Sequence, residues 1–308
     1  MFVVCGEALM DVYVRDSTPT GLLLDARVGG SPFNVAIGLA RLGRESQLLS
    51  GLSNDVPGER LMQSLRDEGV GTALILRSAA PTTLSVVSVG PTGVPSYAFH
   101  GHGAADRQLT VDTLPVLSDA VKALQFGSYA LVVEPVGTAL RALAARERER
   151  RLIAYDPNVR LNVEPDLQRW LPVVQDMVAL SHIVKVSDED LGLLYPNEAP
   201  AVVAQRWLDA GARLVVVTRG ATGCEAWTRQ GHATAPALLV DVIDTVGAGD
   251  TFQAAMLTWL HEHDALTPTA IDALGVPDVV GMLRFAARAA SITCSRRGAD
   301  MPRRAELV

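Results

Sequence analysis

The stretch HIVKVSDEDLGLLYPNEAPAVVAQRWLDAGARLVVVT, residues 182–218, contains two short apolar runs with a helical pattern between them. The runs HIVKVS (182–187) and RLVVVT (213–218) are rich in Val and Ile, and Ala201–Ala210 carries apolar residues at helical spacing. Short, nearly continuous apolar strands that alternate with helices are typical of a parallel sheet covered on both faces. The stretch therefore predicts a doubly wound α/β fold.

The same alternation extends along the chain in both directions. Further strands are predicted at FVVC (2–5), ALVV (130–133) and RLIAYD (151–156). In such a sheet, binding sites lie beyond the carboxyl ends of the strands, which is where the polar segments described below begin. Further helices are predicted at Asn34–Leu42, Pro57–Glu68, Thr138–Arg150, Thr251–His261 and Val279–Ser291.

Two segments depart from this rhythm. Residues 12–28 and 83–106 alternate apolar and polar side chains, and the tripeptide Pro-Thr-Gly at 91–93 supplies a turn within the second segment. They predict a small antiparallel β lid inserted in a single domain that spans residues 1–308. A lid of this kind would shield a reaction site from water.

Composition narrows the class of protein. The 308 residues are 48% hydrophobic and 20% charged, which allows a large buried core. The net charge of −7 argues against nucleic acid as a partner, and the run RERERR (146–151) alternates in sign, as on a solvated helix face. The three cysteines form no paired framework, and we find no secretory signal pattern and no apolar run of about 18 residues. We therefore expect a cytoplasmic protein that does not bind membranes.

The strongest chemical signal is DTVGAGDTFQAAMLTWL (244–260), in which a glycine-rich turn leads directly into an apolar helix. The small residues Gly247, Ala248 and Gly249 let backbone N–H groups approach an anion, and the helix dipole adds positive potential there. Asp250 on its own would be an ordinary helix-start residue. Directly after an anion-binding turn, it can instead be the general base that accepts a hydroxyl proton in phosphoryl transfer.

Two segments resemble the signatures of a known family. DTVGAGDTF (244–252) resembles the C-terminal signature of the ribokinase-like carbohydrate kinases, also called the phosphofructokinase-B family, and GGSPFNVAIGLARLG (29–43) resembles their N-terminal signature. The similarity spans essentially the whole chain and is greatest to bacterial fructokinases. It implies a ribokinase-like fold and an ATP-dependent sugar kinase that requires Mg²⁺, with Asp250 as the base and Gly247, Ala248 and Gly249 as the anion hole.

The resemblance also assigns the sugar site. It places Asp11, Gly29, Gly30 and Asn34 against the sugar, where a carboxylate can accept two hydroxyl hydrogen bonds and glycines let a polyol approach the backbone. For Asn34 alone, capping of a helix is the alternative.

Two further segments resemble parts of the sugar site in fructokinases. SYAFHGHG (96–103) on the lid would place Tyr97 and Phe99 over the sugar. DPNVR (156–160) resembles a D-x-N-x-R segment of fructokinases and ketodeoxygluconate kinases, in which Arg160 would hold a phosphate or a substrate carboxylate. A surface ion pair is the alternative for Arg160.

The resemblance assigns nucleotide and metal contacts as well. The segment KVSDEDL (185–191) stands where relatives often carry N-x-x-E, so Glu189 and Asp190 would organise Mg²⁺ through water, with a capped acidic helix start as the alternative. Asp244 and ITCSRRGAD (292–300) resemble a monovalent cation site, which implies activation by an ion such as K⁺. The contacts assigned to ATP are Lys185, Ser187, Thr218, Arg219, Gly220, Gly223 and Gly249.

Two other classes of nucleotide-binding protein lack their motifs in this chain. No G-x-x-x-x-G-K-[ST] motif occurs, and CGEALMD (5–11) lacks the G-x-G-x-x-G of a dinucleotide-binding fold. A non-catalytic sugar sensor remains as an alternative of another class. Among sugars, fructose is favoured, followed by 2-keto-3-deoxygluconate and then ribose or a nucleoside. Relatives often dimerise through the lid, and its alternating strands can pair edge to edge, so a homodimer is an open expectation.

Overall fold

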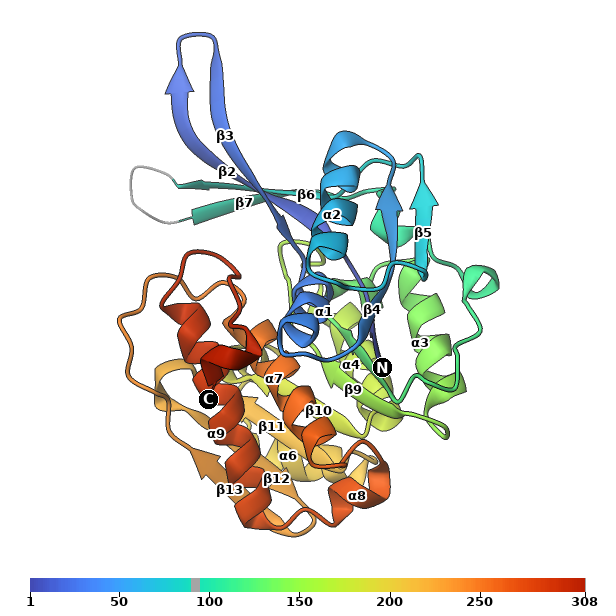
Figure 1. Cartoon of the computed structure of the whole chain (residues 1–308), viewed down its shortest axis with the longest axis vertical. Helices are drawn as coiled ribbons and strands as arrows, with labels where there is room; N and C mark the ends of the chain where they lie inside the picture. Colours follow the sequence, from blue (N-terminus) through green and yellow to red (C-terminus); the bar gives the residue numbers. More distant parts are fainter. Residues whose placement is uncertain (90–94, 308) are drawn as a thin grey trace.

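The computed structural model describes residues 1–89 and 95–307 (Figure 1), so the turn predicted at 91–93 lies outside the described residues. Within them, a nine-stranded sheet forms the centre of the molecule. Its strands are parallel except for β12, which runs antiparallel to both of its neighbours, β11 and β13. The prediction of a mostly parallel, doubly wound sheet is confirmed. In spatial order the strands are β13 (Gly231–Ala235), β12 (Cys224–Thr228), β11 (Leu214–Thr218), β10 (Ile183–Ser187), β9 (Leu152–Asp156), β8 (Ala123–Gly127), β1 (Phe2–Cys5), β4 (Ser46–Ser53) and β5 (Ile75–Ser78).

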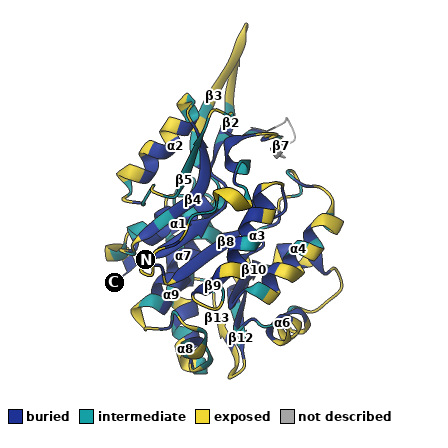
Figure 2. Ribbon diagram, turned by 90° about the vertical axis from the view of Figure 1, so that its right-hand side faces the viewer, coloured by how far each residue is buried: buried dark blue, intermediate teal, exposed yellow. Residues whose placement is uncertain are grey.

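The sheet is buried on both faces, which explains why its strands are continuously apolar (Figure 2). Successive residues point to opposite sides: Leu214 and Val216 join one core cluster, whereas Val215 and Val217 join the other. One layer contains α1 (Ser31–Arg41), α2 (Val56–Asp67), α7 (Ala248–Glu262), α8 (Pro268–Asp272) and α9 (Val276–Cys294). The other layer contains α3 (Val136–Glu147), α4 (Leu167–Leu180), α5 (Asp188–Leu194) and α6 (Pro200–Asp209).

Parts of the main domain differ from the sequence prediction. The strand expected at 130–133 is wrong, because the strand is β8 and the apolar run beyond it forms a buried 3₁₀ turn at Tyr129–Leu131. A short apolar run satisfies a buried turn as well as a buried strand. Helix α4 was not predicted, and Pro172 inside it is a residue that normally argues against a helix.

A second, four-stranded sheet projects from the body (Figure 1). Its order is β3 (Gly21–Gly29), β2 (Leu9–Thr18), β6 (Leu84–Val89) and β7 (Pro95–His100). Each hairpin is antiparallel, but β2 and β6 run parallel to each other, so the small sheet is mixed. Strand β2 begins in the core and ends in solvent, and the tip of its hairpin exposes Leu22, Leu23 and Leu24.

Helices α1 and α7 are in very close contact, because residue 38 of α1 is a glycine. A Cβ atom at Gly38 would lie 2.8 Å from Cβ of Ala254 in α7 and 2.7 Å from Sδ of Met301. Both distances are shorter than van der Waals contact, so any larger residue would push the two helices apart.

No helix within the described ranges is long and apolar enough to cross a membrane.

We predict that Gly38→Ala lowers the free energy of unfolding by about 1–3 kcal/mol, because overpacking outweighs the gain in helix propensity. Gly192→Ala in α5 is the matched control, since a Cβ there meets nothing within 4 Å. The control should be neutral or stabilising by about 0.4–1 kcal/mol. Urea unfolding of the two variants and the parent measures both effects, and equal stability of the two variants would contradict the packing argument.

Candidate active site

The side chain of Asp250 joins the first turns of two helices. Gly247, in the left-handed conformation with φ 79°, precedes α7 and places Asp250 in its first turn. The Ser31 hydroxyl donates to Asp250 Oδ1 at 2.6 Å, and the Asn34 amide donates to Oδ2 at 2.8 Å, both from the first turn of α1. Helix α1 has no side-chain cap, so Asn34 serves this carboxylate and does not cap the helix. Ser31 was not identified from the sequence.

The surroundings of Asp250 suit a proton acceptor. Burial raises the pKa of this carboxyl group, and the hydrogen bonds from Ser31 and Asn34 act in the opposite direction. The charge of Lys185 also lowers the pKa of Asp250, whereas the charge of Asp156 raises it. The group therefore gains basicity from burial and keeps two donors that stabilise its ionised form.

The residues expected to hold a sugar lie close to this carboxylate. A Cβ atom at Gly29 would lie 2.4 Å from Asp11 Oδ2, so the absence of a side chain at residue 29 makes room for Asp11. Gly30 has φ 105°, and a Cβ there would lie 2.8 Å from the Glu7 carbonyl oxygen. Burial raises the pKa of Asp11, and the negative charge of Asp250 acts in the same direction. The two carboxylates therefore share one electrostatic environment.

Arg160 and Phe99 differ in how they relate to this group. Arg160 is exposed, donates Nη1 to the Val159 carbonyl at 3.0 Å, and forms no ion pair with any described residue. The surface ion pair considered above is therefore absent among these residues, and the charge of Arg160 lowers the pKa of Asp11. Phe99 is half-buried and packs edge-on against Tyr129, with ring centroids 5.2 Å apart. The side chain of Tyr97 lies outside the described part of the chain.

A buried polar cluster lies behind the sugar residues and was missed in the sequence. The carboxyl of Asp106 accepts from the Thr83 hydroxyl at 2.5 Å and from the Tyr129 hydroxyl at 2.9 Å. Glu7 is 1% exposed, and burial raises its pKa to about 8. A buried carboxyl with such a pKa is largely protonated at neutral pH, which avoids a second buried charge beside Asp106. Each of these carboxylates stands in an apolar run of the sequence, Glu7 in CGEALMD and Asp106 in AADR, and this pattern could have indicated that they are buried.

Asp156 at the carboxyl end of β9 and Lys185 in the middle of β10 form a buried ion pair of 2.8 Å. A Cβ at Gly249 would lie 3.1 Å from Lys185 Nζ, so the ammonium group is beside the glycine-rich turn. Asp190 follows in α5, and its Oδ1 accepts the Val159 N–H at 3.1 Å. Burial raises the pKa of Asp190 to about 6.

The start of α5 is the capped acidic helix start that was the alternative interpretation of its sequence. Ser187 caps the helix by accepting the Asp190 N–H at 3.0 Å, as in an ordinary acidic helix start. Glu189 is exposed and Asp190 is buried, so the two carboxylates have different surroundings. Among the residues that the structure describes, no cluster of three or more His, Cys, Asp or Glu could hold a metal ion on its own.

The strand-turn-strand segment follows in the neighbouring strand, where Thr218 pairs with Ser187 across β11 and β10. The turn contains Gly220 and Gly223, and Gly223 has φ 102° with a Cβ position 2.3 Å from the Ala235 carbonyl oxygen. The fold therefore requires a glycine at residue 223, whether or not this turn also binds a nucleotide. Arg219 forms an ion pair with Glu225.

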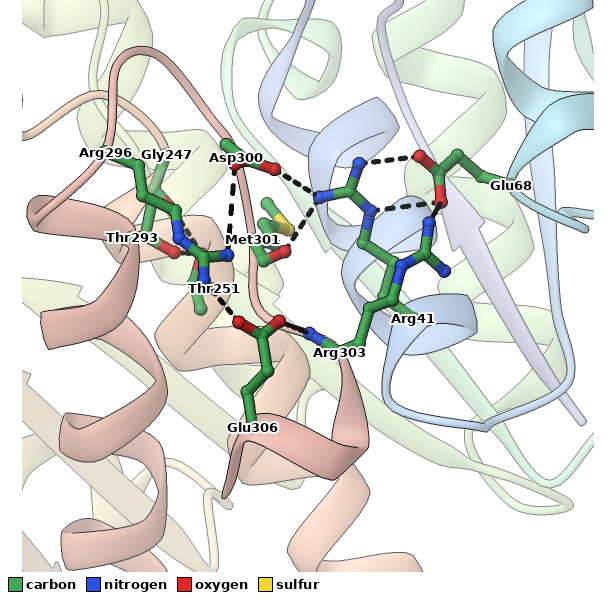
Figure 3. Close-up of polar contacts among 10 residues, drawn as sticks. All are labelled: Arg41, Glu68, Gly247, Thr251, Thr293, Arg296, Asp300, Met301, Arg303 and Glu306. Carbon is green, nitrogen blue, oxygen red and sulfur yellow. Dashed lines mark hydrogen bonds and ion pairs between the residues drawn. The ribbon is translucent and has the colours of Figure 1, made fainter. Parts of the chain in front are cut away.

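The glycine-rich turn is braced by the C-terminal segment (Figure 3). A Cβ at Gly247 would lie 2.5 Å from Cβ of Ala299, and Asp244 accepts the Gly298 N–H at 2.8 Å. The Thr251 hydroxyl donates to the Gly247 carbonyl at 2.8 Å. Ion pairs join residues 296–306 of this segment to one another and to the ends of α1 and α2: Arg41–Asp300, Arg303–Glu68, Arg296–Asp300 and Arg296–Glu306. Arg41 also pairs with Glu68, which joins α1 to the end of α2.

Comparison with known proteins gives the same assignment. Residues 1–305 match the model of the pfkB family carbohydrate kinases. A fructokinase of Rhizobium leguminosarum bv. trifolii is 38% identical over 277 residues, which cover 89% of this chain and 84% of the relative. A Xylella fastidiosa fructokinase structure with bound ATP has a TM-score of 0.87 at 28% identity, covering 99% of this chain and 96% of that one.

A third comparison involves a structure with ligands in place. A fructokinase double mutant of Vibrio cholerae O395, in a form with bound fructose, ADP and potassium ion, has a TM-score of 0.83 at 25% identity. The match covers 99% of this chain and 96% of that one. The two signature segments recognised in the sequence thus lie in a chain that matches one family over almost its whole length. This chain belongs to the pfkB family of carbohydrate kinases.

Proposed function

We propose that the protein transfers the γ-phosphoryl group of ATP to a hydroxyl of fructose and forms fructose 6-phosphate. The observation that carries this proposal is the position of Asp250, in the first turn of α7 after a glycine-rich turn and hydrogen-bonded to the first turn of α1. A carboxylate that faces both an anion-binding turn and a group of sugar-binding residues can accept the proton of an attacking hydroxyl.

The proposed reaction is a direct transfer. The sugar hydroxyl oxygen bonds to the γ-phosphorus, the bond from that phosphorus to the β–γ bridging oxygen breaks, and the hydroxyl proton passes to Asp250. The N–H groups of Gly247, Ala248 and Gly249 are proposed to stabilise charge on the transferring oxygens. Asp11, Gly29, Gly30, Asn34, Tyr97 and Phe99 are proposed to hold the sugar.

The nucleotide is proposed to lie along Lys185, Ser187, Thr218, Arg219, Gly220, Gly223 and Gly249. Mg²⁺ would be held by phosphate oxygens and water, with Glu189 and Asp190 in contact with the waters, because this ion keeps part of its hydration shell. The absence of a cluster of three ligands among the described residues fits such a site. When bound, the ion neutralises charge on the phosphates.

A monovalent cation site is proposed at Asp244. Its carboxylate accepts the Gly298 N–H, and its own backbone N–H donates to the Cys294 carbonyl at 3.2 Å, so Asp244 already contacts the backbone of 294–298. The potassium ion in the Vibrio cholerae fructokinase form supports a cation requirement of this kind. The site would act on catalysis through the adjacent Gly247 turn.

The second candidate substrate is 2-keto-3-deoxygluconate, because Arg160 has no ion-pair partner among the described residues and could bind its carboxylate. The small sheet is proposed to act as a lid over the sugar, formed by about residues 12–28 and 83–106 of a single kinase domain. Its exposed tip residues Leu22, Leu23 and Leu24 favour contact with the lid of a second copy.

We predict that Asp250→Ala lowers kcat by about 10²–10⁴-fold or more, because general base catalysis is lost, while sugar binding persists. Asp241→Ala, which removes an exposed carboxylate from the same segment, is the control and should keep the parental rate. Coupled ADP release measures kcat, and calorimetry measures sugar binding. An Asp250→Ala enzyme with the parental rate would show that another group is the base.

The pH profile of kcat should lose activity on its acid side, because the base must be ionised. Since burial raises the pKa of Asp250, this loss should begin above the usual carboxyl range as the pH falls. Ser31→Ala removes a hydrogen bond that stabilises the charged form, so its acid limb should move to higher pH. An unchanged or lowered acid limb in this variant would contradict the assignment of the titrating group.

The substrate is tested by a screen of fructose, 2-keto-3-deoxygluconate, ribose, tagatose and adenosine, with ADP release as the readout. We expect the largest kcat/KM with fructose, and Arg160→Ala should then reduce kcat/KM by less than about 10-fold. If the keto acid gives the largest value and Arg160→Ala reduces it by about 100-fold or more, the second candidate is correct. No ADP release with any of these sugars would favour the non-catalytic sensor.

For the lid contact, we predict a homodimer that becomes a monomer when Leu22, Leu23 and Leu24 are all changed to Ser. Loss of exposed apolar surface at the contact is the physical reason. Val116→Ser, at a side chain that is 93% exposed in another part of the molecule, is the control and should leave the mass unchanged. Light scattering of the eluted peak measures the mass, and a monomeric parent protein would refute the proposal.

A further inference from the structure

The ion pair between Lys185 and Asp156 is unusual for its depth and for its place. Both side chains are 5% exposed, and the Nζ to Oδ2 distance is 2.8 Å. The second oxygen of the same carboxylate, Asp156 Oδ1, is buried and has no hydrogen-bond partner among the described residues. Removing two charges from water and leaving one acceptor unpaired costs free energy. An ion pair of this kind therefore contributes little to the stability of the fold.

The pair lies beside the glycine-rich turn that precedes α7. Asp156 is the last residue of β9, and Lys185 is the central residue of the neighbouring strand β10. A Cβ at Gly249 would lie 3.1 Å from Lys185 Nζ, so the ammonium reaches the turn that begins α7. Only a glycine leaves this approach open without displacing the ammonium.

The ammonium has unused capacity for hydrogen bonding. A lysine carries three donors, and Asp156 takes one of them among the described residues. The chain has a second lysine, Lys122, whose side chain is exposed and donates to the Asp119 carbonyl at 3.3 Å. Lys185 is therefore the lysine that lies at the proposed site.

We propose that Asp156 is a positioning residue: it holds the ammonium of Lys185, already assigned to the nucleotide, beside Gly249, so that this ammonium contacts the γ-phosphoryl group during its transfer. The inference deepens the proposed function and rests on it. In the step, the lysine stays protonated and forms hydrogen bonds to the oxygens of the transferring group. The hydroxyl proton goes to Asp250, and ADP leaves with the electrons of the broken phosphorus–oxygen bond.

The ion pair also compensates the charge of the Lys185 ammonium while the site is empty. Before ATP binds, the carboxylate of Asp156 compensates the buried ammonium. When the negative phosphoryl group arrives, the two unused donors can engage it without moving the side chain out of its pocket. Preorganised charge of this kind does not have to be reoriented during the reaction, which is what makes it effective.

The first test uses Lys185→Met and Asp156→Asn, alone and together. We expect Lys185→Met to lower kcat by about 10²–10³-fold, as for loss of one donor to a developing charge, with little change in the KM for sugar. Asp156→Asn should lower kcat by about 10-fold or more. The double variant should resemble Lys185→Met, because Asp156 acts through the lysine. Independent, multiplicative losses would overturn the positioning role.

The second readout is the pH profile of kcat, which a merely structural ion pair would not move. The groups that act on Asp250 are Ser31, Asn34, Lys185, Asp156 and Asp11. Removing the positive charge in Lys185→Met should shift the acid limb to higher pH, because that charge favours the ionised base. An acid limb that stays in place would count against contact between Lys185 and the reacting groups.

The matched control is Glu147→Gln, which breaks another buried ion pair, between Glu147 and Arg151. Arg151 directly precedes β9 and Asp156 ends it, so the control pair lies at the opposite end of this strand from Asp156. The control should lower the melting temperature and leave kcat, KM and the pH profile unchanged. If Lys185→Met does not fold, Lys185→Gln replaces it, with the same expected loss of kcat.

The outcomes separate this inference from the proposed function. Sugar-dependent ADP release by the parent protein together with parental kcat in a folded Lys185→Met variant would refute the role of the lysine and leave the kinase assignment in place. No sugar-dependent ADP release by the parent would refute the proposed function itself.

Discussion

The contact between α1 and α7 is the constraint on which the site depends. Because residue 38 has no side chain, α7 approaches until Ala254 and Met301 both lie against this position. Two helices held that closely bring their first turns together, and the carboxylate of Asp250 then reaches Ser31 and Asn34 across the interface. Tight packing in the core thus fixes the geometry of a polar site at its edge.

The second constraint is electrostatic. Burial raises the pKa of Asp11, Asp190 and Asp250, which all lie near the carboxyl edge of the sheet. Carboxylates this close would favour protonated forms unless donors and cations offset the repulsion. Backbone N–H groups, hydroxyls, Lys185 and Arg160 supply that compensation.

The sequence predicted the parts of the structure that follow from periodicity and glycine. Strands β9, β10 and β11 are buried on both faces, and their continuous apolar runs were recognisable. The glycine-rich turn and Asp250 were recognised because small residues directly before an apolar helix are typical of an anion-binding turn. The apolar run at 130–133 was misassigned, since a buried turn and a buried strand have the same composition.

Contacts between distant segments were beyond a single sequence. Ser31 and Asp250 are 219 residues apart, and no local pattern marks that hydrogen bond. The ion pair of Asp156 and Lys185 depends on β9 and β10 being neighbours in the sheet, which their order in the chain suggests but does not require. The parallel pairing of β2 with β6 likewise joins two hairpins that each look purely antiparallel.

The two hydrogen bonds to Asp250 have a consequence for regioselectivity. One oxygen is held by Ser31 and the other by Asn34, so the plane of the carboxylate is fixed and its remaining lone pairs point in set directions. A sugar offers several hydroxyls of similar acidity. If Asp250 is the base, as proposed, the hydroxyl that is phosphorylated is the one whose direction of approach meets the free lone pair.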